Sequence, residues 1–206
     1  IPVDSVEEAR AQRARLDPET TLLCGERGGR KVEGFDLGNS PFEYTPPTVA
    51  GRTLVFCSTN GSRAMIRCRA APEQVLLAFN NATPGTDRLR ESGKDVVLVC
   101  SGKEGRSALE DTALAGMIVD RLGAGRSDLL LDDGAWMARR LWKSWDEDVA
   151  RLLRSGEHGA TLIGLGFEED LDYCARLDSV AVVPVLREGR IEPETDGDHP
   201  RAQATE

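Results

Sequence analysis

Short runs of consecutive apolar residues alternate with amphipathic stretches along this chain of 206 residues. Apolar runs of four to eight residues are typical of strands that are buried on both faces, as in parallel sheets covered by helices. The stretches between them repeat their apolar residues at helical spacing. This alternation predicts an α/β protein with a three-layer α/β/α arrangement and a mostly parallel central sheet.

The predicted elements divide most of the chain between them. We expect strands at 21–24, 53–58, 75–79, 95–100 and 180–185. We expect helices at 5–16, 61–69, 84–92, 108–122, 133–143, 146–154 and 167–177. No linker rich in Pro, Gly and Ser interrupts residues 1–191, so we interpret them as a single domain. Residues 192–206 are polar and acidic and predict a disordered tail.

Composition excludes several classes of partner. A net charge of −9 argues against nucleic acid, whose phosphates require a basic surface. No apolar run approaches the length of about 18 residues that spans a bilayer, and the N-terminus lacks the pattern of a signal peptide. The five cysteines form no C-x-x-C pair, which indicates reduced thiols. We therefore expect a cytoplasmic protein without a membrane or nucleic-acid partner.

Polar, glycine-containing segments follow the predicted strands. Gly25-Glu26-Arg27-Gly28-Gly29 follows the first strand, Thr59-Asn60-Gly61-Ser62 follows 53–58, and Ser101-Gly102 follows 95–100. Ligands of parallel α/β sheets bind at the carboxyl ends of the strands, so these segments predict one shared site. Residues 25–50 form a long connection, and long loops in compact domains are usually functional.

Several of these segments together resemble the 2-phosphosulfolactate phosphatase family. The matching segments are Gly25–Gly29, Gly34-Phe35-Asp36-Leu37-Gly38-Asn39-Ser40-Pro41, Thr59–Ser62, Ser101-Gly102, Glu110-Asp111, Ala115-Gly116, Gly164–Phe167, Asp170 and Val183-Pro184. The resemblance extends from about residue 21 to residue 191. It implies a magnesium-dependent acid phosphatase that hydrolyses 2-phospho-3-sulfolactate, a small anionic phosphomonoester, on the route to coenzyme M.

The N-terminus departs from the family pattern. Family members resemble one another in an N-terminal strand–helix unit with an Asp and an Arg, and the printed sequence lacks this unit. It begins at Ile1-Pro2-Val3-Asp4, which we interpret as the tail of a strand that runs into a helix. The chain is then either a fragment or a natural variant. A strand at 1–3 without its neighbour would present a free edge, which predicts a homodimer, aggregation or low stability.

Four carboxylates are the candidates for a magnesium site, because Mg²⁺ takes one or two carboxylates with waters and phosphate. They are Glu26, Asp36, Glu110 and Asp111. We expect Asp36 and Asp111 to be catalytic as well. Each has a structural alternative: Ser107 to Glu110 is itself a capping box, and the carboxylates of the glycine-rich loops can simply close turns.

The candidate substrate-binding residues lie in the glycine-containing loops. They are Gly34, Gly38, Asn39, Ser40, Thr59, Asn60, Gly61, Ser62, Ser101 and Gly102. The segment 59–62 between a strand and a helix can hold an oxyanion through N–H groups and hydroxyls, or it can be an ordinary helix cap. Ser62 stands where the family usually has Thr, which keeps the hydroxyl. Arg27 or Lys103 could pair with the sulfonate, or could simply be exposed.

The residues leave the reaction route and two rival functions open. Direct attack by water and a phosphoenzyme intermediate are both compatible with them. Cys57 and Cys100 are discounted as nucleophiles because no histidine lies near them in sequence. The rivals are a non-catalytic anion-binding module of the same fold and a phosphatase for another small acidic phosphomonoester.

Overall fold

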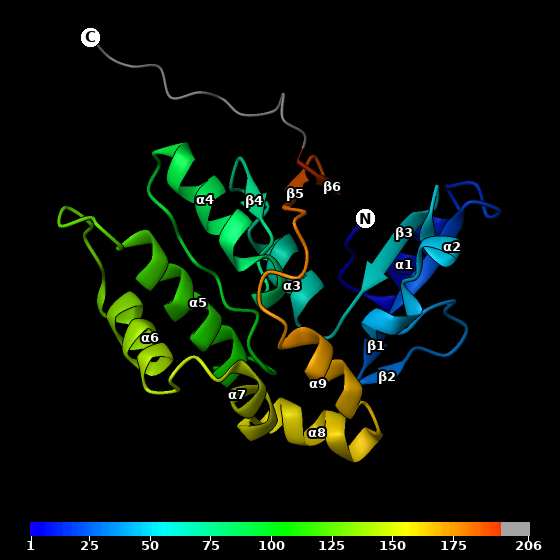
Figure 1. The fold of residues 1–206 in the computed structure, drawn as a ribbon. Coiled ribbons are helices and arrows are strands. Elements are labelled where there is room, and N and C mark those ends of the chain that lie inside the picture. The colour runs from blue at the N-terminus through cyan, green and yellow to red at the C-terminus, as the bar shows by residue number, and fades with distance from the viewer. Residues whose placement is uncertain (195–206) are drawn as a thin grey trace, which may run out of the picture.

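The computed structural model describes residues 1–194 and has the mixed helix and strand content of an α/β protein. Its strands form two three-stranded sheets, ordered β2-β1-β3 and β4-β5-β6 (Figure 1). The strands are β1 Thr21–Arg27, β2 Arg30–Lys31, β3 Thr53–Cys57, β4 Gln74–Val75, β5 Pro184–Arg187 and β6 Arg190–Pro193. The coarse fold class predicted from the hydrophobic pattern is therefore confirmed.

Helices make up most of the remaining described chain. They are α1 Val6–Arg13, α2 Pro46–Val49, α3 Gly61–Arg67, α4 Ala82–Ser92, α5 Leu109–Leu122, α6 Asp133–Lys143, α7 Val149–Ser155, α8 Glu157–Leu165 and α9 Glu168–Cys174. Two short 3₁₀ turns, η1 Pro41–Glu43 and η2 Phe79–Asn81, join them. All seven predicted helices are present within a few residues at their ends, and the sequence analysis missed α2 and α8.

The first sheet is built on parallel pairing of β1 with β3. The register runs from Thr21 opposite Thr53 to Gly25 opposite Cys57, and β2 adds an antiparallel edge. The start of the chain also joins this sheet, because Pro2 forms a parallel bridge with Phe56. The expectation of a strand tail that runs into a helix is confirmed: α1 follows, and Ser5 Oγ accepts from Glu8 N–H at 3.0 Å.

Three predicted strands lack the expected hydrogen-bonded ladder. Only Gln74–Val75 and Pro184–Arg187 pair as strands in two of these regions, and residues 95–100 form no strand. The side chains of Val97 and Val99 are 85% and 57% exposed instead of buried. An apolar run supplies strand propensity but not a neighbour, and an extended segment becomes a strand only where another backbone pairs with it.

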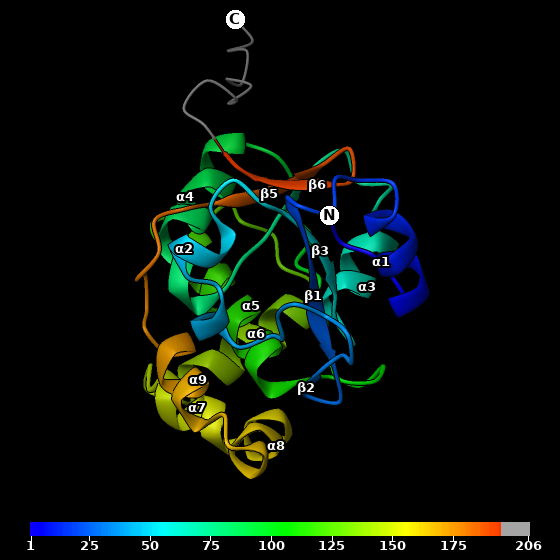
Figure 2. The same ribbon diagram turned by 90° about the vertical axis from the view of Figure 1, so that its right-hand side faces the viewer.

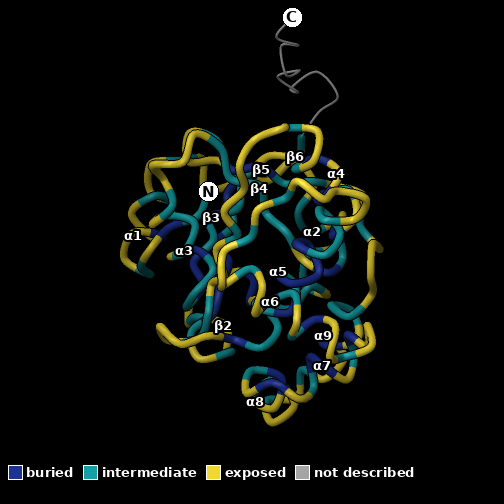
Figure 3. Tube along the Cα trace, turned by 90° about the vertical axis from the view of Figure 1, so that its left-hand side faces the viewer, coloured by how far each residue is buried: buried dark blue, intermediate teal, exposed yellow. Residues whose placement is uncertain are grey.

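Two clusters of buried side chains form the core. One packs α1 against the first sheet through Val3, Ala9, Leu23, Phe35, Val55 and Cys57. The other lies among α4, α5, α6, α7 and α9, where Met117, Ile118 and Leu152 are almost fully buried (Figure 3). Viewed from the side of β1 and β2, the first sheet lies next to the helices of the second cluster, and α8 lies at the bottom of the view (Figure 2).

The hairpin of β5 and β6 is tied to α4 by buried charges. Arg88 donates to both carboxylate oxygens of Glu194 at 2.7 Å and to Glu73 at 2.6 Å. The predicted tail therefore starts later than residue 192, since Arg190–Pro193 is strand β6. The rest of that tail, from residue 195, lies outside the described residues. Among residues 1–194, no helix has the length and apolar character needed to cross a bilayer.

Candidate active site

Loops that follow β3 and the segment 95–100 meet directly. The backbone N–H of Glu104 donates to the Asn60 side-chain oxygen at 3.1 Å, which joins the β3–α3 loop to residues 101–106. Gly102 N–H donates to Asp111 Oδ2 at 2.6 Å and so connects the same loop to the start of α5. The predicted convergence of the two strand-end segments is therefore found, even though residues 95–100 are not a strand.

The other family-like segments close a continuous region around these loops. A Cβ atom at Gly29 would lie 2.7 Å from Leu165 Cδ1, so the glycine-rich turn after β1 packs against the end of α8. Ser40 Oγ donates to Asp170 of α9 at 2.8 Å across 130 residues of sequence. Lys103 Nζ contacts Thr161 Oγ1 of α8 at 3.3 Å. Three segments far apart in the chain thus contact α8 or α9.

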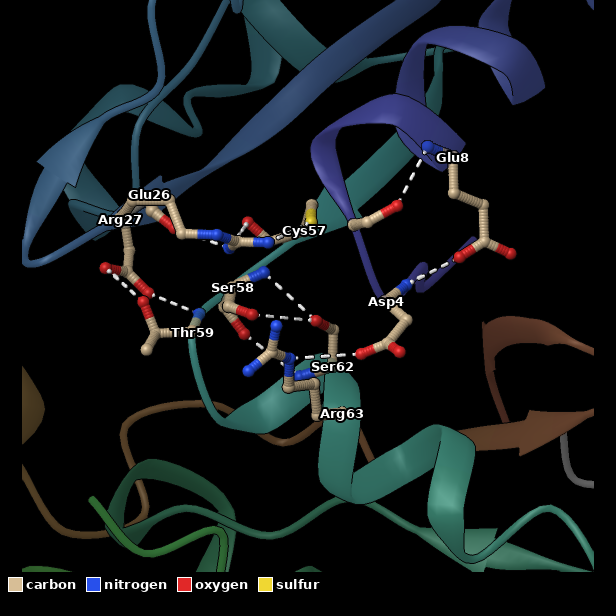
Figure 4. A network of polar contacts seen from close by, with 10 residues as sticks. Asp4, Glu8, Glu26, Arg27, Cys57, Ser58, Thr59, Ser62 and Arg63 are labelled. Carbon is tan, nitrogen blue, oxygen red and sulfur yellow. Dashed lines mark hydrogen bonds and ion pairs between the residues drawn. The ribbon is translucent and has the colours of Figure 1, made fainter. Parts of the chain in front are cut away.

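Glu26 is the penultimate residue of β1 and holds the loop after β3 (Figure 4). Its Oε1 accepts from Thr59 N–H at 2.7 Å, and its Oε2 accepts from Thr59 Oγ1 at 3.1 Å and from Gly29 N–H at 2.9 Å. The residue is buried. Both oxygens are already used by these donors, so the prediction that Glu26 is a metal ligand does not fit its environment.

The polar groups of the 59–62 segment are also largely used within the protein. Ser58 N–H donates to Ser62 Oγ at 3.0 Å, and Ser62 N–H donates to Ser58 Oγ at 2.9 Å. Ser62 is 0% exposed, and Thr59 gives both donors to Glu26. Neither hydroxyl is free for a substrate, contrary to the prediction. The N–H groups of Asn60 and Gly61 have no hydrogen-bond partner in the described part of the chain.

Asp36 belongs to the packing of the 34–41 loop on α1 and β1. Its Oδ2 accepts from Leu23 N–H at 2.8 Å and pairs with Arg13 Nη1 at 2.9 Å. Within residues 1–194, no three His, Cys, Asp or Glu side chains gather as a metal-binding group. The predicted cluster of four carboxylates is therefore not formed, because β1 directs Glu26 and the loop directs Asp36 to partners of their own.

Glu110 and Asp111 remain together in the first turn of α5. The helix begins after Ala108, without a side-chain cap, so the capping box predicted from Ser107 to Glu110 is absent. Glu110 has no hydrogen-bond or ion-pair partner among the described residues. Two neighbouring carboxylates with free oxygens fit Mg²⁺, which takes one or two carboxylates and completes its shell with water and phosphate.

The pKa of Asp111 is raised above its ordinary value. Burial is the main cause, and the nearby charge of Glu110 raises it further, whereas the Gly102 N–H and the nearby His158 lower it.

His158 comes from α8, one of the two helices that were not predicted from the sequence. Gly159 and Gly164 lower its helix propensity, but a Cβ at Gly159 would lie 1.9 Å from Leu153 O, so tight packing on α7 requires glycine there.

The basic side chains near these loops differ in whether a carboxylate already pairs with them. Arg27 donates to Cys57 Sγ at 2.9 Å and to the Glu26 carbonyl at 2.8 Å, and it has no carboxylate partner among residues 1–194. Lys103 and Arg106 both pair with Glu157 at 3.0 Å. Arg27 is therefore the half-buried cation next to the strand ends whose charge is not paired. Burial also raises the pKa of the Cys57 thiol, which disfavours a thiolate nucleophile.

The remaining predicted substrate residues lie in two loops. Gly38 is enclosed, since its N–H donates to Glu43 at 2.9 Å and its carbonyl accepts from Tyr44 at 2.7 Å. Gly34, Asn39 and Ser101 are exposed, and Gly102 has φ 69° at the turn that reaches Asp111. Ser40 lines a cavity of about 480 Å³ with Phe42, Phe167 and Asp170.

An α/β fold whose polar loops meet at the acidic start of α5 is typical of proteins that act on small polar molecules. Comparison with known proteins makes this class specific. A family model described as 2-phosphosulpholactate phosphatase matches residues 1–189, and the chain belongs to this family.

Curated relatives agree with the family model. A protein of Caldanaerobacter subterraneus subsp. tengcongensis is 37% identical over 95% of this chain and 81% of its own length. A protein of Thermotoga petrophila is 40% identical over 92% of this chain and 79% of its own length. A protein of Synechococcus sp. strain JA-2-3B'a(2-13) is 46% identical over 79% of this chain and 68% of its own length. All three are named probable 2-phosphosulfolactate phosphatase.

Proposed function

We propose that this protein is a phosphoric monoester hydrolase that releases phosphate from 2-phospho-3-sulfolactate, a step toward coenzyme M, in the cytoplasm. Membership of the family supports the reaction. The observation that carries the assignment is the contact between Asn60 and Glu104, together with that between Gly102 and Asp111. These contacts connect the β3–α3 loop, whose Asn60 and Gly61 N–H groups have no partner among residues 1–194, to the start of α5, where Glu110 accepts no hydrogen bond and Asp111 accepts one.

The proposed roles follow from which groups are unoccupied. The N–H groups of Asn60 and Gly61 donate to phosphate oxygens, and Arg27 pairs with one of the other acidic groups of the substrate. Glu110 and Asp111 would hold the magnesium ion, and Asp111 is the catalytic carboxylate of the pair. When bound, magnesium supplies positive charge that stabilises the phosphoryl group in the transition state.

Two finer structural proposals accompany this function. We propose a three-layer α/β/α arrangement around a mostly parallel sheet, supported by the parallel pairing of β3 with β1 and with Pro2. We also propose that the protein forms a homodimer. Sedimentation at several protein concentrations tests the dimer.

A non-catalytic anion-binding module is the second candidate. The observation that favours it is that residues 1–194 contain no metal-binding group of three or more ligating side chains, whereas free backbone N–H groups are present. A module of this kind would bind phosphate without hydrolysing any ester.

A substrate panel distinguishes the two candidates. Phosphate release is measured for 2-phospho-3-sulfolactate, for the analogue without the sulfonate and for 2-phosphoglycerate, with magnesium and with a chelator. Hydrolysis of the sulfonated ester at the highest kcat/KM supports the proposal. Hydrolysis that favours another ester identifies a different substrate, and binding of phosphate without hydrolysis of any ester supports the anion-binding module.

A further inference from the structure

Asp170 is a buried carboxylate that belongs to the segments resembling the family but has no role in the site described above. It lies in the first turn of α9, is 9% exposed and has no ion-pair partner among residues 1–194. Burial of an unpaired charge is unfavourable unless hydrogen bonds compensate for it. The one side chain that donates to it is Ser40, whose Oγ lies 2.8 Å from Asp170 Oδ1.

The Ser40 hydroxyl contacts Asp170 and does not cap the 3₁₀ turn that follows it. It is the residue before the 3₁₀ turn η1, a position at which a serine hydroxyl usually accepts from a following N–H group, yet it makes no such bond. Its proton goes instead to a carboxylate 130 residues away. A second contact reinforces the same connection, because Phe42 and Tyr173 stack edge-to-face with ring centroids 5.5 Å apart. The 34–41 loop and the turn η1 that follows it are thus each fixed to α9 by one contact.

The carboxylate faces a cavity as well as Ser40. Asp170 and Ser40 both line the cavity of about 480 Å³ at the junction of η1 with α8 and α9. Among residues 1–194, no fully buried side-chain oxygen lacks a partner, so Asp170 Oδ2, which receives no hydrogen bond, is at least partly accessible. Asn39, next to Ser40, is exposed and makes no hydrogen bond of its own.

We infer that Asp170 is a positioning residue for the substrate-contacting part of the 34–41 loop. It holds Ser40 through the hydroxyl proton and thereby fixes the direction in which Asn39 faces the site; this step rests on the proposed phosphatase function. Because the proton of Ser40 is used, the hydroxyl acts toward a ligand only as an acceptor, so it contacts a hydroxyl or a hydrated cation and not a phosphate oxygen.

Three substitutions at this pair test the inference. Asp170→Ala removes the acceptor, Ser40→Ala removes the donor, and the double variant removes both. We expect each single variant to raise KM about tenfold with kcat changed less than threefold, as for a lost hydrogen bond to a charged group that orders the loop. The double variant should be no worse than either single one, because the residues act as a unit. Asp170→Asn keeps an acceptor and should restore most of the lost affinity.

Asp172→Ala on the same helix is the matched control, since Asp172 is exposed and pairs with Arg154 outside this contact. A second readout does not need activity: amide hydrogen exchange of residues 37–43 should accelerate about tenfold in Asp170→Ala and stay unchanged in Asp172→Ala.

The outcomes separate this inference from the proposed function. Additive KM effects in the double variant, or unchanged exchange in residues 37–43, would overturn the positioning role. If the wild-type protein hydrolyses no ester, the proposed function fails, and accelerated exchange in Asp170→Ala alone then still supports Asp170 as the anchor of the loop.

Discussion

Glu26 accepts two hydrogen bonds from a single residue, Thr59, at 2.7 Å from the backbone N–H and 3.1 Å from the hydroxyl. The end of β1 thereby fixes the first residues after β3, in addition to the ladder between the two strands. The loop's remaining N–H groups, those of Asn60 and Gly61, have no hydrogen-bond partner among residues 1–194.

Glu26→Gln should therefore destabilise the protein without removing a magnesium ligand. The amide of glutamine places a donor against a donor of Thr59 or Gly29, which costs about 1–3 kcal/mol for a buried unsatisfied group. Urea unfolding measures the loss, with Glu33→Gln on the exposed loop as the control. We expect magnesium to raise the melting temperature of the wild type, as a ligand of the folded state does, and this rise should persist in Glu26→Gln. Its disappearance would show that Glu26 binds the metal after all.

Gly25→Ala should be the more damaging of two glycine substitutions in the same segment. Gly25 has φ 140°, and a Cβ there would lie 1.9 Å from Cys57 O, so the paired strands would have to separate. Gly28 also has positive φ, at 59°, but open space surrounds it, and its replacement should cost only about 1–2 kcal/mol. Chemical unfolding of both variants compares them. Equal losses would mean that the close approach of β1 and β3 does not limit this position.

Asp111 should make the metal-free protein less stable as the pH rises. Its pKa is raised in the folded state, so the folded chain holds the proton more tightly than the unfolded chain does. The resulting contribution is present below the usual pKa of 3.8 and is lost as the pH rises through the raised value. Asp111→Asn keeps an acceptor for Gly102 N–H and should lack this loss.

Unfolding at a series of pH values in a chelator measures the effect, with the exposed Asp87→Asn on α4 as the control. We expect Asp111→Asn to gain stability relative to the wild type toward neutral pH. An asparagine variant that is less stable at every pH would mean that the ionised carboxylate supports the fold.

Arg88→Ala should loosen the C-terminal hairpin from α4. The Arg88 side chain is 4% exposed and that of Glu194 is 6% exposed, so removal of the arginine leaves a buried carboxylate without its main partner. Such a loss costs about 3–5 kcal/mol. Arg90→Ala, whose partner Asp87 is largely exposed, should cost less than about 1 kcal/mol. Thermal melting of both variants is the measurement, and similar shifts would contradict the role given to the buried network.

The sequence predicts the helices better than the strands for a physical reason. A helix closes its hydrogen bonds locally, so the cap at Ser5 and the apolar spacing of residues 109–122 are sufficient to indicate α1 and α5. A strand depends on a neighbour that may be distant in sequence. The apolar run at 95–100 has strand propensity, but no backbone pairs with it in the described chain.

For the candidate site, the sequence likewise predicts what depends on nearby residues better than what depends on residues far along the chain. The polar segments after β1 and β3 indicate its place, because strand ends determine where loops converge. Individual roles depend on partners far along the chain: Glu26 on Thr59, Asp36 on Arg13, and Ser40 on Asp170. Carboxylates that look equivalent in sequence are therefore separated by the hydrogen bonds that they already accept. Among residues 1–194, Glu110 accepts none and Asp111 accepts one, from Gly102 N–H.

The most direct test of this account is the rate of phosphate release from 2-phospho-3-sulfolactate by the wild type and Asp111→Asn, with and without magnesium. We predict release by the wild type that requires magnesium and falls by about a hundredfold or more in Asp111→Asn, because a carboxylate that would hold magnesium is then lost. Asp87→Asn should retain the wild-type rate. Equal magnesium-dependent rates in the wild type and Asp111→Asn would contradict the account, because the chemistry would then lie away from the start of α5.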